Sequence, residues 1–344
     1  MNSNPSKTST KSKQTPSRDA NQPEKKKLSV KISSSKEVIP SFYTKASKPN
    51  STIIKACHSL SKDGKDDSGK PKKNQDTYLI IRDLLQLENV NIFAVMDGHG
   101  EHGEQVSGQI KRFFLSQFNN NKVIIKVKNA DELYTALSTN NFELLRQLFK
   151  DAEKSLSKCN IDYQLSGTTC VMVIQIGRRL ISANVGDSRC IFINGDNSIK
   201  ELSRDHKPDL ADEKERITSK GGEIAQFEDN GVKSGPFRIW CKGHSYPGIA
   251  MSRSIGDKIA SELGVICDPE IIEYEIPSDA KFMILASDGI WEFLDNEKVK
   301  DIVMPCYTNN NAESACSTLI KKAVECWLGE DVCVDDITIV TVFF

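Results

Sequence analysis

The stretch VNIFAVMDGHGEHG, residues 90–103, joins an almost wholly apolar run to a loop of glycines and histidines. The apolar run is typical of a strand buried in a core. It stops at Asp97, which is followed by Gly98 and Gly100. A carboxylate with glycine neighbours at the end of a core strand suits a tight turn, a nucleotide-binding loop or a metal site.

The nucleotide-binding alternative comes from the spelling GHGEHG, residues 98–103, which matches the pattern GxGxxG. A dinucleotide-binding loop also needs an acidic residue about twenty positions later, which holds the ribose hydroxyl. No Asp or Glu occurs between Glu104 and Asp131. Asp97, directly before the first glycine, would also repel a pyrophosphate. The sequence therefore disfavours a dinucleotide site.

The composition is that of a globular protein. The 344 residues are 38% hydrophobic and 27% charged, and no stretch approaches the roughly 18 apolar residues of a membrane span. The ten cysteines form no CxxC pair, which argues against structural zinc and favours reduced thiols. Because no apolar signal segment is present at the N-terminus, we expect a cytoplasmic or nuclear protein that is not secreted and does not insert into membranes.

The first fifty residues differ from the rest in charge. Residues 1–50 carry ten Lys and one Arg against three acidic residues, a net charge of +8, so the remainder carries −9 to reach the total of −1. This segment is rich in Ser, Thr and Lys and has too little apolar surface to offset its ordering entropy. We predict a disordered basic tail over residues 1–50 and a globular domain over residues 52–344.

Short apolar or alternating runs predict strands, and 3.6-residue periodicity predicts helices. Strands are expected at residues 77–81, 91–96, 168–176, 179–185, 189–193, 282–287 and 337–344. Helices are expected at residues 104–118, 131–158 and 312–328. The strands follow one another with turn residues between them, whereas the helices fall in two separate blocks. This order favours an α+β fold of antiparallel sheets with helices packed on them.

Aspartates recur at the ends of five predicted strands: Asp76, Asp97, Asp187, Asp288 and Asp335. A single aspartate in such a place is usually a turn former or a helix cap. Five together would gather like charges at one edge of the sheets, which is unfavourable unless cations neutralise them. Oxygen ligands select hard ions such as Mg²⁺ or Mn²⁺, and a neighbouring glycine lets a backbone carbonyl approach the same ion. The pattern therefore predicts a divalent-metal centre.

Eight short motifs along the chain carry a family resemblance. They are MDGHG (96–100), SGTT (166–169), ANVGDSR (183–189), LSRDHKP (202–208), GIAMSRSIGD (248–257), GVICDPE (264–270), ASDGIWEFL (286–294) and DDITIV (335–340). In this order they resemble the protein phosphatase 2C family, the metal-dependent protein phosphatases. The resemblance runs from about Lys55 to Phe344, and residues 235–257 are most similar to plant and protist members.

The resemblance implies a four-layer α/β/β/α sandwich, in which helices flank two antiparallel sheets and a metal centre lies at one edge. Residues 52–344 would then be the catalytic domain, with two Mg²⁺ or Mn²⁺ ions. It makes Asp97 the bridge between the ions, with the Gly98 carbonyl on the second ion. Asp288 and Asp335 would complete the first, and Asp76 would orient metal-bound water.

Two further sets of residues are expected near this centre. The resemblance places a weaker third ion at Asp187, with Asp288 and Glu292 as possible additional ligands. His99, two residues after Asp97, is the expected general acid that protonates the departing serine or threonine oxygen. The other histidines have no comparable setting, and we expect them to be structural.

Three positions depart from the family pattern. Members often carry Arg where this chain has Pro71, and we expect Lys72 or Lys73 to contact the substrate phosphate instead, without the bidentate geometry of Arg. Gln75 replaces a common Glu, which removes one acidic ligand of the second metal. Asp336 replaces a frequent Asn. Because the core ligands are retained, we expect activity.

The predicted function is hydrolysis of phosphoserine and phosphothreonine in proteins by metal-activated water. None of the cysteines lies in the phosphate-cradling context of a phosphotyrosine-type nucleophile. The alternative is a catalytically silent relative that binds phosphoproteins as a scaffold, which the retained carboxylates disfavour. We expect phosphorylated proteins as partners, no nucleic acid, and a monomeric chain.

Overall fold

The computed structural model describes residues 52–66, 68–330 and 333–344. The predicted basic tail, residues 1–50, lies outside this part of the chain, so its state remains a prediction. All the described strands and helices belong to one compact unit.

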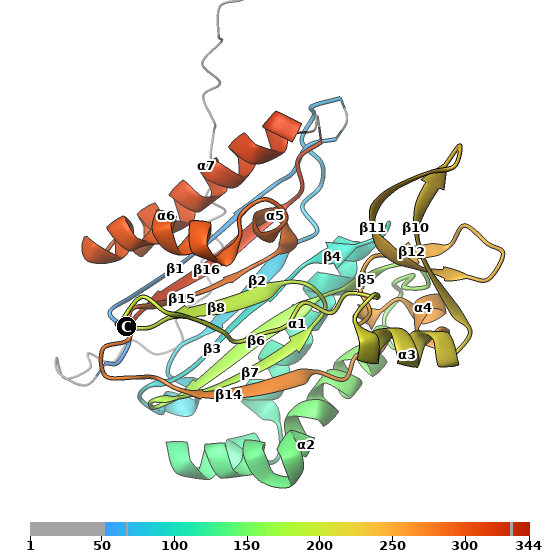
Figure 1. Cartoon of the computed structure of the whole chain (residues 1–344). Coiled ribbons are helices and arrows are strands. Elements are labelled where there is room, and N and C mark those ends of the chain that lie inside the picture. Colours follow the sequence, from blue (N-terminus) through green and yellow to red (C-terminus); the bar gives the residue numbers. More distant parts are fainter. Residues whose placement is uncertain (1–51, 67, 331–332) are drawn as a thin grey trace, which may run out of the picture. The chain divides into compact units, whose positions relative to one another are not determined.

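Two five-stranded sheets form the centre of this unit (Figure 1). The first has the order β14-β7-β6-β3-β2, with β2 at Thr77–Ile81, β3 at Val90–Met96, β6 at Cys170–Ile176, β7 at Arg179–Val185 and β14 at Glu270–Glu275. The second has the order β1-β16-β15-β8-β9, with β1 at Ala56–Lys62, β8 at Arg189–Ile193, β9 at Ile199–Glu201, β15 at Phe282–Ala286 and β16 at Ile337–Phe343. Neighbouring strands pair antiparallel in both sheets, as predicted.

Helices cover the outer face of each sheet (Figure 1), with α1 and α2 on the first sheet and α5, α6 and α7 on the second. Their bounds are Gly103–Asn120 for α1, Ala130–Leu156 for α2, Asp288–Trp291 for α5, Asn296–Thr308 for α6 and Ala312–Glu330 for α7. Two of these helices begin at capping side chains: Asn129 accepts a hydrogen bond from the backbone N–H of Glu132, and Asp295 from that of Lys298. The four-layer α/β/β/α arrangement is confirmed.

The alternation of side chains along β3 explains why its sequence is apolar throughout. Ile92, Ala94 and Met96 belong to the core between the first sheet and its helices. Phe93 and Val95 point the other way and belong to the core between the two sheets. A strand covered on both faces needs apolar residues at every position, so the run ends only where the strand leaves the sandwich.

A smaller lobe lies beside the sandwich. It consists of α3 (Ala211–Ser219), β10 (Gly222–Asp229), β11 (Val232–Cys241), β12 (Pro247–Ile249) and α4 (Lys258–Glu262). Its own core is small, formed by Ile217, Ile239, Ile249, Ala260 and Val265. A further three-stranded sheet has the order β13-β5-β4, with β4 at Gly98–His99, β5 at Gly167–Thr168 and β13 at Ile255–Gly256. Two single 3-10 turns lie at Leu84–Gln86 and Ile124–Lys126.

Glu213 of α3 ties the smaller lobe together although its side chain is fully buried. Its carboxylate accepts hydrogen bonds from Arg216 Nη2 at 2.5 Å, from Arg253 Nη2 at 2.6 Å and from Ser252 Oγ at 2.5 Å. Burial alone would raise the pKa of this carboxyl, but the two guanidinium groups and the hydroxyl outweigh burial and lower it well below its usual range. The buried charge is therefore fully compensated.

The sequence-based elements are confirmed with two corrections. The strand predicted over residues 168–176 is interrupted at Thr169, between β5 and β6. The reason is local: the Thr169 backbone N–H donates to the Asp97 carbonyl at 2.8 Å, and its hydroxyl accepts from the Asp97 backbone N–H at 3.0 Å. The helix predicted over residues 131–158 is α2, but its backbone leaves helical geometry at residues 139–142.

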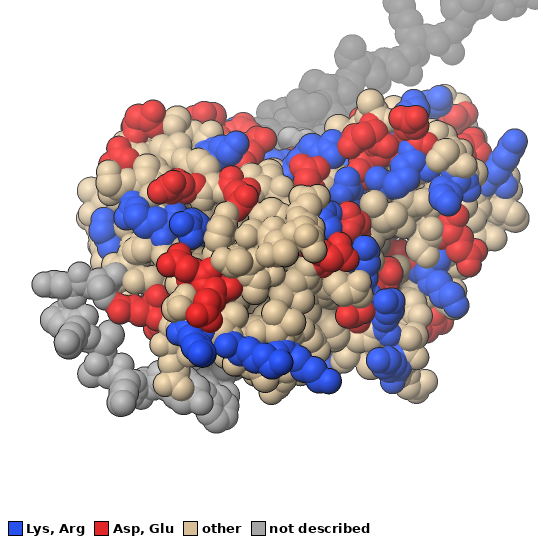
Figure 2. Space-filling view, turned by 90° about the horizontal axis from the view of Figure 1, so that it is seen from below, with Lys and Arg blue, Asp and Glu red and all other residues tan. Residues whose placement is uncertain are grey.

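On the face shown in Figure 2, basic and acidic side chains are interspersed with uncharged surface. None of the helices in the described part of the chain is long and apolar enough to cross a membrane.

Candidate functional site

Two of the predicted aspartates meet because their strands are antiparallel neighbours in the first sheet. Asp97 follows the last residue of β3, and Asp76 precedes the first residue of β2. Met96 pairs with Thr77 across the two strands, so the end of one strand lies beside the start of the other. Antiparallel pairing thus brings together two carboxylates that are 21 residues apart in the sequence.

The second sheet places two more aspartates in the same way. Asp288 follows β15 after one intervening residue, Asp335 lies two residues before β16, and β15 pairs antiparallel with β16. The Ser287 hydroxyl donates a 2.7 Å hydrogen bond to Asp76 Oδ2, which joins the ends of the two sheets. The Asp288 carboxylate is also close enough to Asp97 for its charge to raise the pKa of Asp97. Four carboxylates therefore gather at one edge of the sandwich.

The electrostatics of this cluster are unfavourable for the protein alone. Burial, followed by neighbouring charges, raises the pKa of Asp76 to about 7 and that of Asp288 to about 8. Burial and the carboxylates of Asp76, Asp288 and Asp335 raise the pKa of Asp97 well above its usual range. Asp76 Oδ1 and Asp288 Oδ1 are buried without a hydrogen-bond partner. Unpaired carboxylate oxygens that crowd one another are the donor set that a hard divalent cation neutralises.

Two lysines pair with the outer carboxylates. Lys72 Nζ forms an ion pair with Asp335, and Lys207 Nζ lies 2.5 Å from Asp187 Oδ2. In the described part of the chain, no three His, Cys, Asp or Glu side chains converge as a complete ligand set. The residues nevertheless fit a cation by their chemistry, because Asp187 Oδ1, like the two oxygens above, is buried and unpaired. A bound ion would compete with these lysines for the carboxylates.

The residues expected at a third ion differ in burial, and Asp187 is close enough to Asp288 for its charge to raise the pKa of that carboxyl. Asp187 is 3% exposed and lies in the loop between β7 and β8. Glu292 is exposed at the C-terminal end of α5, one helical turn after Asp288. The Asp187 carboxylate forms an ion pair with Lys207.

Gly98 occupies a place where a side chain has no room. A Cβ there would lie 2.5 Å from the Gln75 carbonyl oxygen and 2.5 Å from that of Gly103. Gln75 also fixes this loop: its side-chain Nε2 donates to the Gly100 carbonyl at 2.6 Å. Gln75, which stands where family members often carry Glu, therefore holds the loop that carries Asp97 in place by a hydrogen bond.

The other departures from the family pattern have visible contacts. Lys73 is 73% exposed and pairs with Glu104, whereas Lys72 is about one-third exposed and reaches the aspartate cluster. Pro71 is exposed and forms an isolated bridge with Lys65. Asp336 is buried, and its carboxylate accepts from the backbone N–H groups of Gly64 at 2.6 Å and Gln75 at 3.0 Å. Asp336 thus connects the chain around Gly64 with the chain around Gln75.

His99 reveals a site residue that sequence reasoning missed. Its Nε2 lies 2.6 Å from Oδ2 of Asp257, which is 3% exposed. Burial opposes the charged imidazole, but Asp257, helped by Asp187 and Asp288, outweighs burial and raises the pKa of His99. Asp257 ends the motif GIAMSRSIGD, so its family match was visible in the sequence, whereas its contact with His99 was not.

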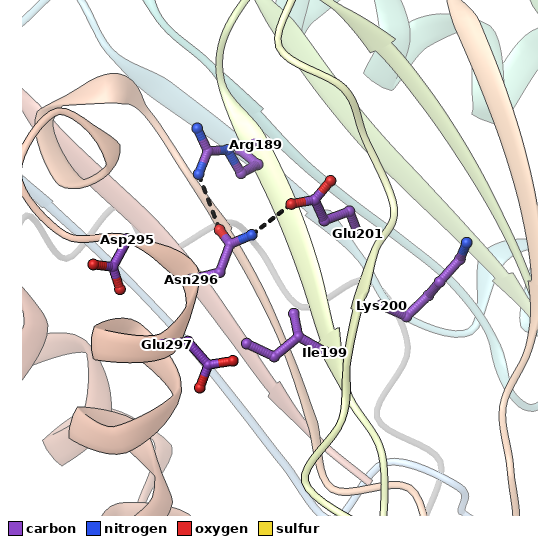
Figure 3. A pocket seen from close by; sticks show the side chains of 7 residues that line it. All are labelled: Arg189, Ile199, Lys200, Glu201, Asp295, Asn296 and Glu297. Atoms are coloured by element: carbon purple, nitrogen blue, oxygen red, sulfur yellow. Dashed lines mark hydrogen bonds between the residues drawn. The ribbon is translucent and has the colours of Figure 1, made fainter.

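The pocket in Figure 3 is a separate feature. It has a volume of about 550 Å³ and lies between β8, β9 and the start of α6. Its Arg189 is already engaged, since it pairs with Asp205 at 2.6 Å and donates to Asn296 at 2.9 Å. Asn296 in turn donates to Glu201 at 2.7 Å. Three of the pocket's polar side chains thus bond to one another, and it is a weaker candidate site than the aspartate cluster.

Comparison with known proteins agrees with the family resemblance that the motifs carry. A family model described as protein phosphatase 2C matches residues 64–327. The chain belongs to the protein phosphatase 2C family. Membership in this family of protein phosphatases makes the aspartate edge the candidate active site.

Curated relatives and solved structures agree with this assignment. Probable protein phosphatase 2C 35 of Arabidopsis thaliana is 30% identical over 79% of this chain and 78% of its own length. Probable protein phosphatase 2C 61 of the same plant is 32% identical over 72% of this chain and 73% of its own length. The crystal structure of serine-threonine phosphatase 2C from Toxoplasma gondii has the same fold, with a TM-score of 0.66 at 21% identity over 86% of this chain and 96% of that one.

Proposed function

We propose that the chain is a metal-dependent protein serine/threonine phosphatase that uses Mg²⁺ or Mn²⁺. The observation that carries this proposal is the group of four aspartates at one edge of the sheets. Burial and crowding raise the pKa of three of them, Asp76, Asp97 and Asp288, and two of the buried oxygens have no hydrogen-bond partner. Cations that neutralise this group would remove the cost of crowding the charges. Family membership supports the same conclusion.

Each residue of the cluster has a distinct part in this proposal. Asp97 would contribute to the binding of both ions, the Gly98 carbonyl to that of the second, and Asp288 and Asp335 to that of the first. When bound, the ions supply positive charge that makes water more acidic and withdraws electrons from the phosphoryl group. Asp76, held by the Ser287 hydroxyl, orients the attacking water. A weaker third ion at Asp187 would have to displace Lys207.

Two other side chains act on the substrate itself. His99 donates a proton to the departing serine or threonine oxygen, which is a poor leaving group without it. Lys72 pairs with Asp335 at the edge of the cluster and would there contact the substrate phosphate. Lys73 is held at the surface by Glu104, so Lys72 is the stronger of the two candidates. The substrates of this site would be phosphorylated proteins.

The direct test is phosphate release from a phosphoserine peptide by the full chain with Mn²⁺ or Mg²⁺. We expect turnover with either ion and none after EDTA treatment, with recovery when the ion is restored. Full activity after exhaustive chelation would contradict metal dependence. An inactive protein that still binds phosphopeptides would instead support a silent scaffold.

A further inference from the structure

The three-stranded sheet β13-β5-β4 brings the His99 side chain to a carboxylate that the metal centre does not use. His99 of β4 pairs with Gly167 of β5, and Gly167 pairs on its other side with Gly256 of β13. Asp257 follows Gly256 directly. His99 and Asp257 thus stand on opposite sides of one central glycine.

Gly167 is the reason that the two side chains can meet. A Cβ at this position would lie 2.0 Å from Asp257 Oδ2 and 2.8 Å from His99 Nε2. Residues two strands apart are normally separated by the side chain of the residue between them. With no side chain at Gly167, His99 Nε2 and Asp257 Oδ2 approach to 2.6 Å.

Asp257 is itself held in place. Its Oδ2 also accepts a 2.6 Å hydrogen bond from the Ser254 hydroxyl, and its backbone N–H donates to the Ser166 carbonyl at 2.9 Å. The carboxylate is almost fully buried. A buried carboxylate with fixed donors accepts from an N–H, so it selects the imidazole form that carries a proton on Nε2. His99 Nδ1 is buried and has no hydrogen-bond partner.

We infer that Asp257 is the positioning residue that makes Nδ1 of His99 the proton-donating atom. This inference rests on the proposed phosphatase function. In the step, the P–O bond to the serine breaks, its electron pair goes to the serine oxygen, and the Nδ1 proton moves to that oxygen. Water supplies the oxygen that replaces it on phosphorus, and a proton from solvent restores Nδ1–H. The Nε2 proton stays on the imidazole throughout, donated in a hydrogen bond to Asp257 Oδ2. Asp257 does not contact the substrate.

The experiment compares Asp257→Asn with Asp268→Asn on two substrates, a phosphoserine peptide and p-nitrophenyl phosphate. Asp268 is a matched control because it is also a paired aspartate, 2.7 Å from Arg146. For Asp257→Asn we expect a loss of about 10–100-fold in kcat on the peptide, by analogy with the loss when a carboxylate that orients a metal-binding histidine is removed. On p-nitrophenyl phosphate, whose phenolate leaves without a proton, kcat should change little. The control should match the wild type on both.

A double-mutant cycle with His99→Ala separates positioning from general structural damage. If Asp257 acts through His99, Asp257→Asn should cost nothing further in the His99→Ala background. Should Asp257→Asn fail to fold, Gly167→Ala makes the same test, because its methyl group pushes the pair apart. Equal losses on both substrates, or additive losses in the cycle, would overturn the inference alone. A wild-type protein inactive on both substrates would overturn the proposed function, and this inference with it.

Discussion

Replacing Glu213 by Gln should destabilise the protein far more than replacing its neighbour Asp212 by Asn. Glu213 is fully buried and accepts from Arg216, Arg253 and Ser252, so the change leaves two guanidinium groups without their counter-charge. Breaking a buried ion pair on one side costs about 3–5 kcal/mol. Because both guanidinium groups remain partly exposed, at 23% and 12%, we expect a value near the lower end, about 3 kcal/mol.

Asp212 provides a control in the same helix turn. Its carboxylate is 57% exposed and pairs with Arg204, which is itself 38% exposed. Exposed pairs of this kind contribute about 0–1 kcal/mol. The contrast is therefore between a buried and a solvated carboxylate at adjacent positions, with the same chemical change at each.

The assay is urea and thermal unfolding of the full chain and both variants in the presence of EDTA. A loss of about 3 kcal/mol corresponds to a drop of roughly 6–12 °C in Tm for a domain of about 150–250 residues, so this larger domain should show a drop near the lower end of that range. The core around Ile217 is small and separate from the larger cores, so the slope of the urea transition should be compared as well, because a lower slope would show that this lobe unfolds on its own.

The pH dependence of stability provides a second test of the role of Glu213. The folded pKa of Glu213 is lowered from an ordinary value of 4.5, so its contribution is fully present above about pH 4.5 and is lost as the pH falls through the folded pKa. The stability difference between wild type and Glu213→Gln should therefore be constant from pH 8 to 5 and shrink below about pH 4.5. If Glu213→Gln unfolds at the same urea concentration as Asp212→Asn, the buried carboxylate is not the anchor that the contacts indicate.

Three more outcomes are expected. Asp97→Asn should abolish both turnover and Mn²⁺ binding measured by calorimetry, since it removes the charge proposed to be shared by two ions. In EDTA the Tm of this variant should rise, because a crowded carboxylate with a raised pKa is gone. Normal Mn²⁺ affinity in this variant would contradict the bridging role. Lys72→Ala should raise KM for a phosphopeptide about tenfold, the equivalent of one charged hydrogen bond. Lys73 is exposed, so Lys73→Ala should leave KM unchanged. Equal effects of the two substitutions on KM would show that neither lysine is specific for phosphate. Deleting residues 1–50 should leave kcat on a small phosphopeptide unchanged, and a large loss would mean that this segment contributes to the catalytic domain.

The strands that carry the site could be predicted because burial on both faces leaves a strong local signal. The runs that became β2, β3, β7, β8, β15 and β16 are short, apolar and bounded by turn residues, and an aspartate lies within two residues of one end of each run. Asp97 and Asp288 were found in this way without any knowledge of pairing. The smaller lobe was missed because β10 and β11 are largely exposed and polar, so their sequences lack the alternation of a half-buried strand.

Helices α3 and α6 were missed for a related reason. Helix α3 buries only Glu213 and Ile217, so it has almost no apolar periodicity. Its most important buried residue is charged, and a glutamate in a polar helix is usually solvated. Helix α6 is short and contains Pro305, which counts against a helix in any local pattern.

By itself, the sequence determined the class of fold, the edge at which the aspartates would gather and the kind of ion that they suit. Those conclusions need only the period of the hydrophobic pattern and the chemistry of carboxylates. Only the tertiary structure decided which groups each side chain meets: Asp257 for His99, Lys72 for Asp335, and Arg253 for Glu213. The physical reason is that these contacts join side chains up to 263 residues apart in the sequence. They depend on the order of the strands in the sheets and on the space left by the missing side chain of Gly167, and the local hydrophobic pattern of the sequence records neither of these.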